Sequence, residues 1–159
     1  LKVYRYCKPR ELRHIYAIKG QGGVYPFIGK ASTATRVGAT LFPIGANSGK
    51  DAVMERLKVD PPSEADVPCG GYCHFPDDAG KGYDEYYFNT LTAEKKVLRY
   101  VKGRQRFEWV PKRKGARNEG LDLRVYATAA LEIRNPSLKA DTAVTAKKKR
   151  RRGVVSKGL

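Results

Sequence analysis

Residues 117–136, RNEGLDLRVYATAALEIRNP, carry the clearest helical pattern in the chain. The spacing predicts a helix over about 119–134, because its apolar side chains recur on one stripe. The stripe consists of Leu121, Val125, Ala129 and Ile133. Asn118 can cap the start of this helix, and Asn135 with Pro136 ends it. One face of the helix is therefore expected to pack against other elements.

The rest of the chain mixes extended and helical segments. Strands are predicted where β-forming residues gather between turn signals, at 14–20, 40–45, 72–76, 96–101 and 107–110. The last two flank Gly103–Arg104 and are expected to form a hairpin. Helices are predicted at about 49–57, where Asn47 or Ser48 can cap, and at 84–89. Residues 3–7 fit either a short helix or a strand. This mixture predicts an α/β class.

Composition limits the kind of protein that the chain can form. Its 159 residues suit one domain, and 41% of them are apolar, too many for a wholly disordered chain. No run approaches the roughly 20 apolar residues of a membrane helix. Three cysteines indicate intracellular thiols in place of a disulfide framework. The net charge of +16 points to a polyanionic partner, with nucleic acid as the default.

The positive charge is unevenly distributed along the chain. Residues 137–159 hold eight basic residues and one acid, with no apolar period, which is typical of a disordered basic tail. We therefore divide the chain into a domain at 1–136 and a tail at 137–159. The tail can be simply solvated, or it can make salt-sensitive contacts with phosphates. Glu11 is the only acid in the first 50 residues.

Two carboxylates stand out on the predicted last helix. Glu119 and Asp122 are three residues apart and share one face. Carboxylates suit Mg²⁺, and a bound Mg²⁺ can activate water for phosphoryl chemistry. The alternative is an acidic first turn that the helix dipole favours. The residues alone leave both interpretations open.

Three other motifs are weaker evidence of function. Residues 45–51, GANSGKD, resemble a phosphate loop but are one residue short, and Asp51 stands where Ser or Thr should bind magnesium. Cys69, Cys73 and His74 do not have a standard zinc spacing, so structural thiols and a packed histidine are expected. The ten tyrosines fit core or strand positions as well as base stacking.

Several stretches, in order along residues 3–134, resemble the large terminase subunit of lambda-type phages. The similar stretches are 15–20, 41–45 with 50–51 and 56–57, 71–76, 87–88, 91–95, 117–122, 125–127 and 129–131. The resemblance implies the C-terminal endonuclease domain of that subunit, with an RNase H-like fold in which helices flank a mixed central sheet. Such domains cut concatemeric double-stranded viral DNA during genome packaging, using Mg²⁺ or Mn²⁺.

The resemblance also implies roles for particular residues. Glu119 and Asp122 would be metal ligands and, with Lys50, catalytic. DNA backbone contacts would come from Lys50, Arg113, Lys114 and Arg117. The family's first-strand aspartate is expected upstream of Leu1, and Asn47 stands where an acid is usual. The second ligand is therefore left open among Asp51, Asp77 and Asp78.

The resemblance further implies partners and a location. The full-length protein would act with a small terminase subunit and a portal in the host cell cytoplasm. The ATPase motor of the family has no counterpart in this sequence. Cutting should depend little on base contacts, since the basic residues position DNA without reading it. The alternative function is a non-catalytic basic module that binds DNA or RNA.

Overall fold

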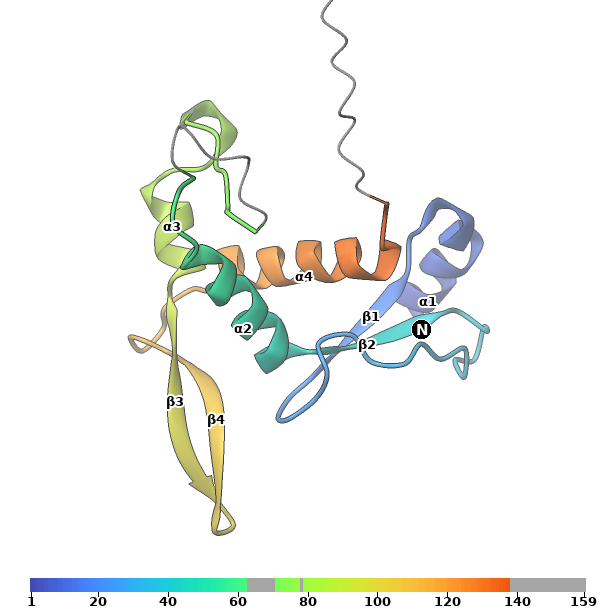
Figure 1. Ribbon diagram of the computed structural model, residues 1–159. Helices are drawn as coiled ribbons and strands as arrows, with labels where there is room; N and C mark the ends of the chain where they lie inside the picture. The colour runs from blue at the N-terminus through green and yellow to red at the C-terminus, as the bar shows by residue number, and fades with distance from the viewer. Residues whose placement is uncertain (63–70, 78, 138–159) are drawn as a thin grey trace, which may run out of the picture.

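The computed structural model describes residues 1–62, 71–77 and 79–137, so most of the predicted tail lies outside the described residues. Helices and strands are mixed along the chain, which confirms the α/β class (Figure 1). In order, the elements are α1 (Lys2–Cys7), η1 (Lys8–Arg13), β1 (Ala17–Gln21), β2 (Leu41–Gly45), α2 (Ala46–Leu57), η2 (Ala79–Lys81), α3 (Glu85–Leu91), β3 (Glu94–Val101), β4 (Arg104–Pro111) and α4 (Glu119–Arg134). No helix in the described ranges is long and apolar enough to cross a membrane.

The first two strands form a parallel pair, with Ala17 opposite Leu41 and Gln21 opposite Gly45. Parallel strands require a crossover connection, and residues 22–40 supply an irregular one. This connection folds back along β2 through isolated bridges, one of which joins Ile28 to Ile44. The strand β2 is therefore held on both sides where it leads into α2.

The helix α2 begins at Ala46, directly after β2 and three residues before the predicted start. The predicted cap is wrong: Gly45 is the N-cap residue, and Asn47 and Ser48 lie in the first turn. The carbonyl groups of the connection lie over this turn. The Ser48 hydroxyl donates to the Tyr25 carbonyl, and Asn47 Nδ2 donates to the Gly23 carbonyl at 3.4 Å. The sequence that resembles a phosphate loop is thus helical.

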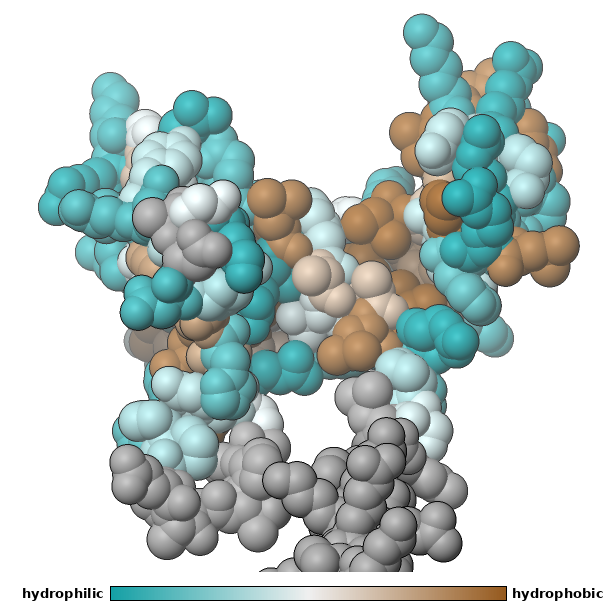
Figure 2. Space-filling model, turned by 90° about the horizontal axis from the view of Figure 1, so that it is seen from above, coloured by the Kyte–Doolittle hydropathy of each residue, from teal (hydrophilic) through white to brown (hydrophobic). Residues whose placement is uncertain are grey.

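The core is formed where α2, α3 and α4 meet, around Val53, Leu91, Leu121 and Val125. The predicted stripe on α4 is confirmed at Leu121, Val125 and Ala129, which are buried. Viewed from above, further apolar side chains gather in the middle of the molecule (Figure 2). A 310 Å³ cavity lies between β1 and α4. The described residues therefore leave some apolar surface of α4 uncovered.

Gly49 lies where α2 crosses α4, and Gly49→Ala is expected to destabilise the domain by up to about 2 kcal/mol, because overpacking costs about 1–3 kcal/mol. A Cβ there would lie 2.6 Å from Phe27 Cε2 and 2.7 Å from Val125 Cγ1. Overpacking should outweigh the gain in helix propensity, about 1 kcal/mol. Urea unfolding measures the change. Gly20→Ala is the control, because no atom other than those of the neighbouring residues in the chain lies within 4 Å of its Cβ position. Equal stability of the two variants would contradict the prediction.

The predicted hairpin is confirmed: β3 and β4 pair antiparallel from Glu94 opposite Pro111 to Val101 opposite Arg104. Its turn is Lys102–Gly103, one residue earlier than predicted, and both residues have positive φ (52° and 74°). That conformation suits a two-residue hairpin turn, which favours glycine. The hairpin projects from the body of the molecule (Figure 1).

The strands form two separate two-stranded sheets in the described part of the chain. The single mixed central sheet expected from the family resemblance is not seen there. The hairpin contacts the body through α2, where Trp109 Nε1 donates to Asp51 Oδ1 at 3.0 Å. The strand β4 therefore lies beside a helix, and β3 and β4 do not extend the β1–β2 sheet.

The predicted strand at 72–76 is wrong, because this segment has no strand pairing. Phe75 instead packs edge-on against α3, with its ring centroid 5.1 Å from that of Phe88. His74 is exposed and lies edge-on to Tyr72, with the ring centroids 4.7 Å apart, so the packed histidine expected from the sequence is not found. Cys73 is a free thiol, as is buried Cys7, and Cys69 lies outside the described residues.

Candidate functional site

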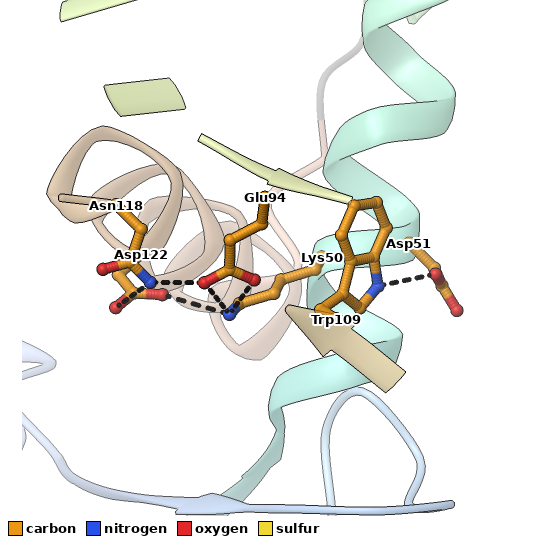
Figure 3. Close-up of polar contacts among 6 residues, drawn as sticks. All are labelled: Lys50, Asp51, Glu94, Trp109, Asn118 and Asp122. Carbon is orange, nitrogen blue, oxygen red and sulfur yellow. Dashed lines mark hydrogen bonds and ion pairs between the residues drawn. The ribbon is translucent and has the colours of Figure 1, made fainter. Parts of the chain in front are cut away.

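Four polar side chains converge where α2, β3 and the start of α4 meet (Figure 3). Lys50 Nζ lies 2.7 and 2.8 Å from the two carboxylate oxygens of Glu94, and 3.8 Å from Asp122 Oδ1. Asn118 Nδ2 donates to Glu94 Oε1 at 2.6 Å and to Asp122 Oδ2 at 3.3 Å. Two carboxylates therefore share one ammonium and one amide. We call these four residues the acid–lysine cluster.

Each member of the cluster is fixed by its place in an element. Lys50 lies in α2, and Glu94 is the first residue of β3. Asn118 is the N-cap residue of α4, as predicted, but its side chain makes no capping hydrogen bond. It contacts the two carboxylates instead. Asp122 follows one turn later, so the start of α4 directs two polar side chains toward Glu94.

The two carboxylates have different surroundings. Glu94 has a side chain only 5% exposed, and Lys50 and Asn118 satisfy it. Such pairing is required of a buried charge. The Asp122 side chain is 42% exposed. Partial burial raises the pKa of Asp122 above its usual value; Lys50 opposes this rise, and the nearby Glu94 carboxylate adds to it. The cluster thus has a buried acid and an acid that faces solvent.

Glu119 does not join the cluster. Its carboxylate accepts a hydrogen bond from Arg117 Nε at 2.8 Å, on an exposed part of the helix start. Its own backbone N–H and the Arg117 guanidinium lower the pKa of Glu119. The structure therefore brings together two of the predicted catalytic residues, Lys50 and Asp122, and places Glu119 with Arg117. A metal-binding role for Glu119 stays a prediction.

Sequence reasoning missed Glu94 as a site residue. The signal was available, because Glu94 lies in a stretch that resembles the terminase family and is an acid at the start of a predicted hairpin segment. No spacing rule connects position 94 with positions 50 and 122. The contact depends on how β3 lies against α2 and α4, which local pattern does not reveal.

The other acids considered as second ligands lie elsewhere. Asp51 accepts from Trp109 and pairs with Lys96 Nζ at 2.9 Å, so it joins α2 to the hairpin. Figure 3 shows it on the far side of Lys50 from Asp122. Asp77 is exposed, and Asp78 lies outside the described residues. Glu11 accepts from the Thr40 backbone N–H at 2.6 Å and so ties η1 to the start of β2.

The donor set fits a hard cation. Carboxylate oxygens are the preferred ligands of Mg²⁺, which usually binds to one or two carboxylates and keeps several waters. Glu94 and Asp122 provide two carboxylates that already share a positive charge. No group of three or more His, Cys, Asp or Glu side chains suited to a metal occurs among the described residues. Remaining ligands would have to be water, a phosphate or groups outside that set.

The pKa values of the two acids on α4 are expected to be shifted in opposite directions. Asp122 should titrate above the ordinary aspartate value of about 3.9, and Glu119 below the ordinary glutamate value of about 4.3. The contribution of Asp122 to stability is fully present at pH values below its pKa in the unfolded chain. It is lost as the pH rises through its pKa in the folded protein. The contribution of Glu119 is present above its unfolded pKa and is lost as pH falls through the folded value. Carboxyl NMR titration measures both pKa values.

Arg117→Gln is the control for this titration. It removes one cause of the lowered Glu119 pKa, so that value should rise while the Asp122 midpoint moves much less. Shifts of the same sign at both residues would show that the described surroundings are wrong.

Exposed basic residues flank the acid–lysine cluster. Arg113, Lys114 and Arg117 lie on the loop between β4 and α4, immediately before Asn118. These are three of the four residues predicted to contact DNA. The fourth, Lys50, has its ammonium bound to Glu94. The site of this mixed α/β domain thus combines two paired carboxylates with a neighbouring basic loop.

Similarity to known proteins gives the family. A family model described as "Terminase large subunit gpA, endonuclease domain" matches residues 1–143. The large terminase subunit of Escherichia phage lambda is 35% identical over 133 residues, which are 82% of this chain and 20% of that protein. That of Enterobacteria phage P21 is 33% identical over 147 residues, 91% of this chain and 22% of that protein. The chain belongs to the family of terminase large-subunit endonuclease domains.

This membership confirms the resemblance inferred from the sequence. The chain spans about a fifth of the length of the two phage relatives. No solved structure matches it.

Proposed function

We propose that the chain is a divalent-metal-dependent endonuclease domain that hydrolyses phosphodiester bonds of double-stranded DNA. The observation that carries this proposal is the convergence of Glu94 and Asp122 on Lys50, in a chain of the terminase endonuclease family. In the full-length protein, the reaction would cut concatemeric DNA during genome packaging, with Mg²⁺ or Mn²⁺ held by these two carboxylates.

The bound cation would supply an activated water and offset negative charge on the phosphate. The protein residues prepare its site. Asn118 is a positioning residue, because its amide bridges the two carboxylates. Lys50 fixes the buried Glu94 and lies within 4 Å of Asp122. Asp122 faces solvent and is the member that a phosphate can approach first.

The basic loop would hold the DNA. Arg113, Lys114 and Arg117 are exposed and precede the cluster along the chain. Contacts from such residues to phosphates position a duplex without reading its sequence. Cutting is therefore proposed to show little dependence on sequence. The basic tail, residues 137–159, would add salt-sensitive contacts.

Several finer assignments rest on the family alone. We propose an RNase H-like arrangement for the complete domain and a further aspartate ligand upstream of Leu1. We also propose a small terminase subunit and a portal as partners, and the host cell cytoplasm as location. The large-subunit names of the two relatives support a role in packaging.

Nicking of supercoiled plasmid tests the function. The assay uses Mn²⁺ or Mg²⁺ with the 159-residue chain and with a version extended upstream of Leu1. Cutting should require the metal and stop with EDTA, and Asp122→Asn should reduce it strongly. Glu132→Gln is the control, because Glu132 lies on the same helix and pairs with Arg56 at 3.8 Å. Unchanged cutting by Asp122→Asn would overturn the assignment.

A non-catalytic binding module remains the competing function. One observation favours it, namely that Lys50 already neutralises Glu94 as a structural ion pair would. It predicts salt-sensitive binding of DNA or RNA, no cutting by either version of the chain and no effect of metal.

A further inference from the structure

A basic pocket adjoins the acid–lysine cluster. It has a volume of about 510 Å³ and lies between α3, the start of β3 and the loop 112–117. Its cationic and aromatic lining consists of Lys112, Arg113, Lys114, Arg117 and Tyr86. Arg117 pairs with Glu119, whereas the other three cations make no ion pair with any residue that the structure describes. The pocket therefore has positive charge available for a ligand.

The pocket is joined to the cluster by the backbone. Ala93 and Arg117 line it, and each immediately precedes a cluster residue, Glu94 or Asn118. The Lys112 backbone N–H donates to the Ala93 carbonyl at 2.8 Å, which ties the loop to the start of β3. The loop then closes through the Ala116 N–H to the Arg113 carbonyl at 3.1 Å. A ligand in the pocket would therefore contact the residues that immediately precede Glu94 and Asn118 in the chain.

Size and chemistry together indicate the kind of ligand. The volume falls within the range of small-ligand pockets, about 300–1,000 Å³. Three unpaired cations suit a phosphate group. Tyr86 is 59% exposed and supplies an aromatic face on which a base can stack. These features match one nucleotide with its phosphate better than a continuous, stacked duplex, which offers no free base face.

We propose that this pocket receives one unstacked nucleotide of the DNA strand next to the bond that is cut. Its phosphate would lie on Lys112, Arg113 and Lys114, and its base against Tyr86. The proposal deepens the proposed function and rests on it. It assigns roles to Lys112 and Tyr86 that the family resemblance does not give.

Binding of DNA in EDTA tests the pocket without cutting. The probe is a duplex with a single bulged 2-aminopurine, compared with the same duplex fully paired. Fluorescence anisotropy should show about 10-fold tighter binding of the bulged duplex, and the 2-aminopurine should be quenched. Tyr86→Ala should abolish both effects, whereas Tyr86→Phe should retain them.

The contribution of the positive charge in the pocket is tested by replacing three of its basic residues together. Lys112→Ala/Arg113→Ala/Lys114→Ala should weaken binding of both duplexes and lower the salt slope by about 2 to 3. Lys2→Ala/Arg5→Ala/Arg13→Ala is the matched control, since it removes the same charge from exposed residues of α1 and η1. Equal behaviour of the two triple variants, or a preference for the bulge that survives Tyr86→Ala, would overturn the proposal.

The two proposals fail in distinguishable ways. If Mn²⁺-dependent nicking is absent while Tyr86→Ala abolishes the preference for the bulge, the endonuclease assignment fails and the nucleotide pocket stands. If nicking requires Asp122 while Tyr86→Ala still prefers the bulge, the pocket fails and the endonuclease assignment stands.

Discussion

Replacing Glu94 by glutamine is expected to reduce Mn²⁺-dependent nicking by at least about 100-fold. Changes of groups that only orient metal ligands cost about 10- to 100-fold, so loss of a ligand itself should reach or exceed that range. The amide oxygen of glutamine can still accept hydrogen bonds from Lys50 and Asn118, which contact Glu94 now. The variant should therefore still fold and bind DNA, although the negative charge of Glu94 is lost from the site.

Glu119→Gln is the decisive comparison for this variant. Both changes remove one carboxylate, but Glu119 is exposed and paired with Arg117. Nicking by Glu119→Gln should stay within a few-fold of the unmodified chain if Glu94 is the second ligand. The reverse result, with Glu94→Gln active and Glu119→Gln inactive, would restore the pair predicted from sequence. Anisotropy with duplex DNA confirms that both variants still bind.

The local sequence pattern was sufficient to predict most of the helices and strands. The helix α4 has the predicted bounds because its apolar spacing, Asn118 and Asn135 all agree. The hairpin follows from two β-rich stretches around Gly103. The error at 72–76 has a tertiary cause: aromatic residues there have high strand propensity, yet Phe75 packs against α3 and finds no strand partner. Propensity describes only what a segment favours before such contacts form.

The candidate site was only partly predictable, for a related reason. Asp122 and Lys50 were found from a helical spacing and a family resemblance. Glu94 was not found, because its role depends on burial against Lys50, 44 positions earlier in the sequence. Asn118 was interpreted as a cap, since asparagine before a helix commonly caps it. Its amide contacts two carboxylates instead, and that choice reflects how close Glu94 lies. Charge pairing across elements was the missing information.

Lys50→Met is expected to destabilise the domain by about 3–5 kcal/mol, because it leaves a buried carboxylate without its charge partner. Glu94 would keep only the Asn118 amide. Urea unfolding followed by Trp109 fluorescence measures the change, since Trp109 is the one tryptophan and contacts α2 at Asp51. Lys96→Met is the matched control: Lys96 also pairs with an acid, Asp51, but both side chains are about 40% exposed. An exposed pair of this kind contributes up to about 1 kcal/mol.

The double variant Lys50→Met/Glu94→Gln separates the ion pair from the packing of the lysine side chain. Removing both charges takes away the unpaired buried carboxylate, so the double variant should be more stable than Lys50→Met alone. Most of the loss should therefore be recovered if burial of the Glu94 charge is its cause. Should Lys50→Met cost no more than Lys96→Met, the Lys50–Glu94 contact would be a solvated pair. Glu94 would then need no fixed counter-ion, and the acid–lysine cluster would lose its structural basis as a preorganised cation site.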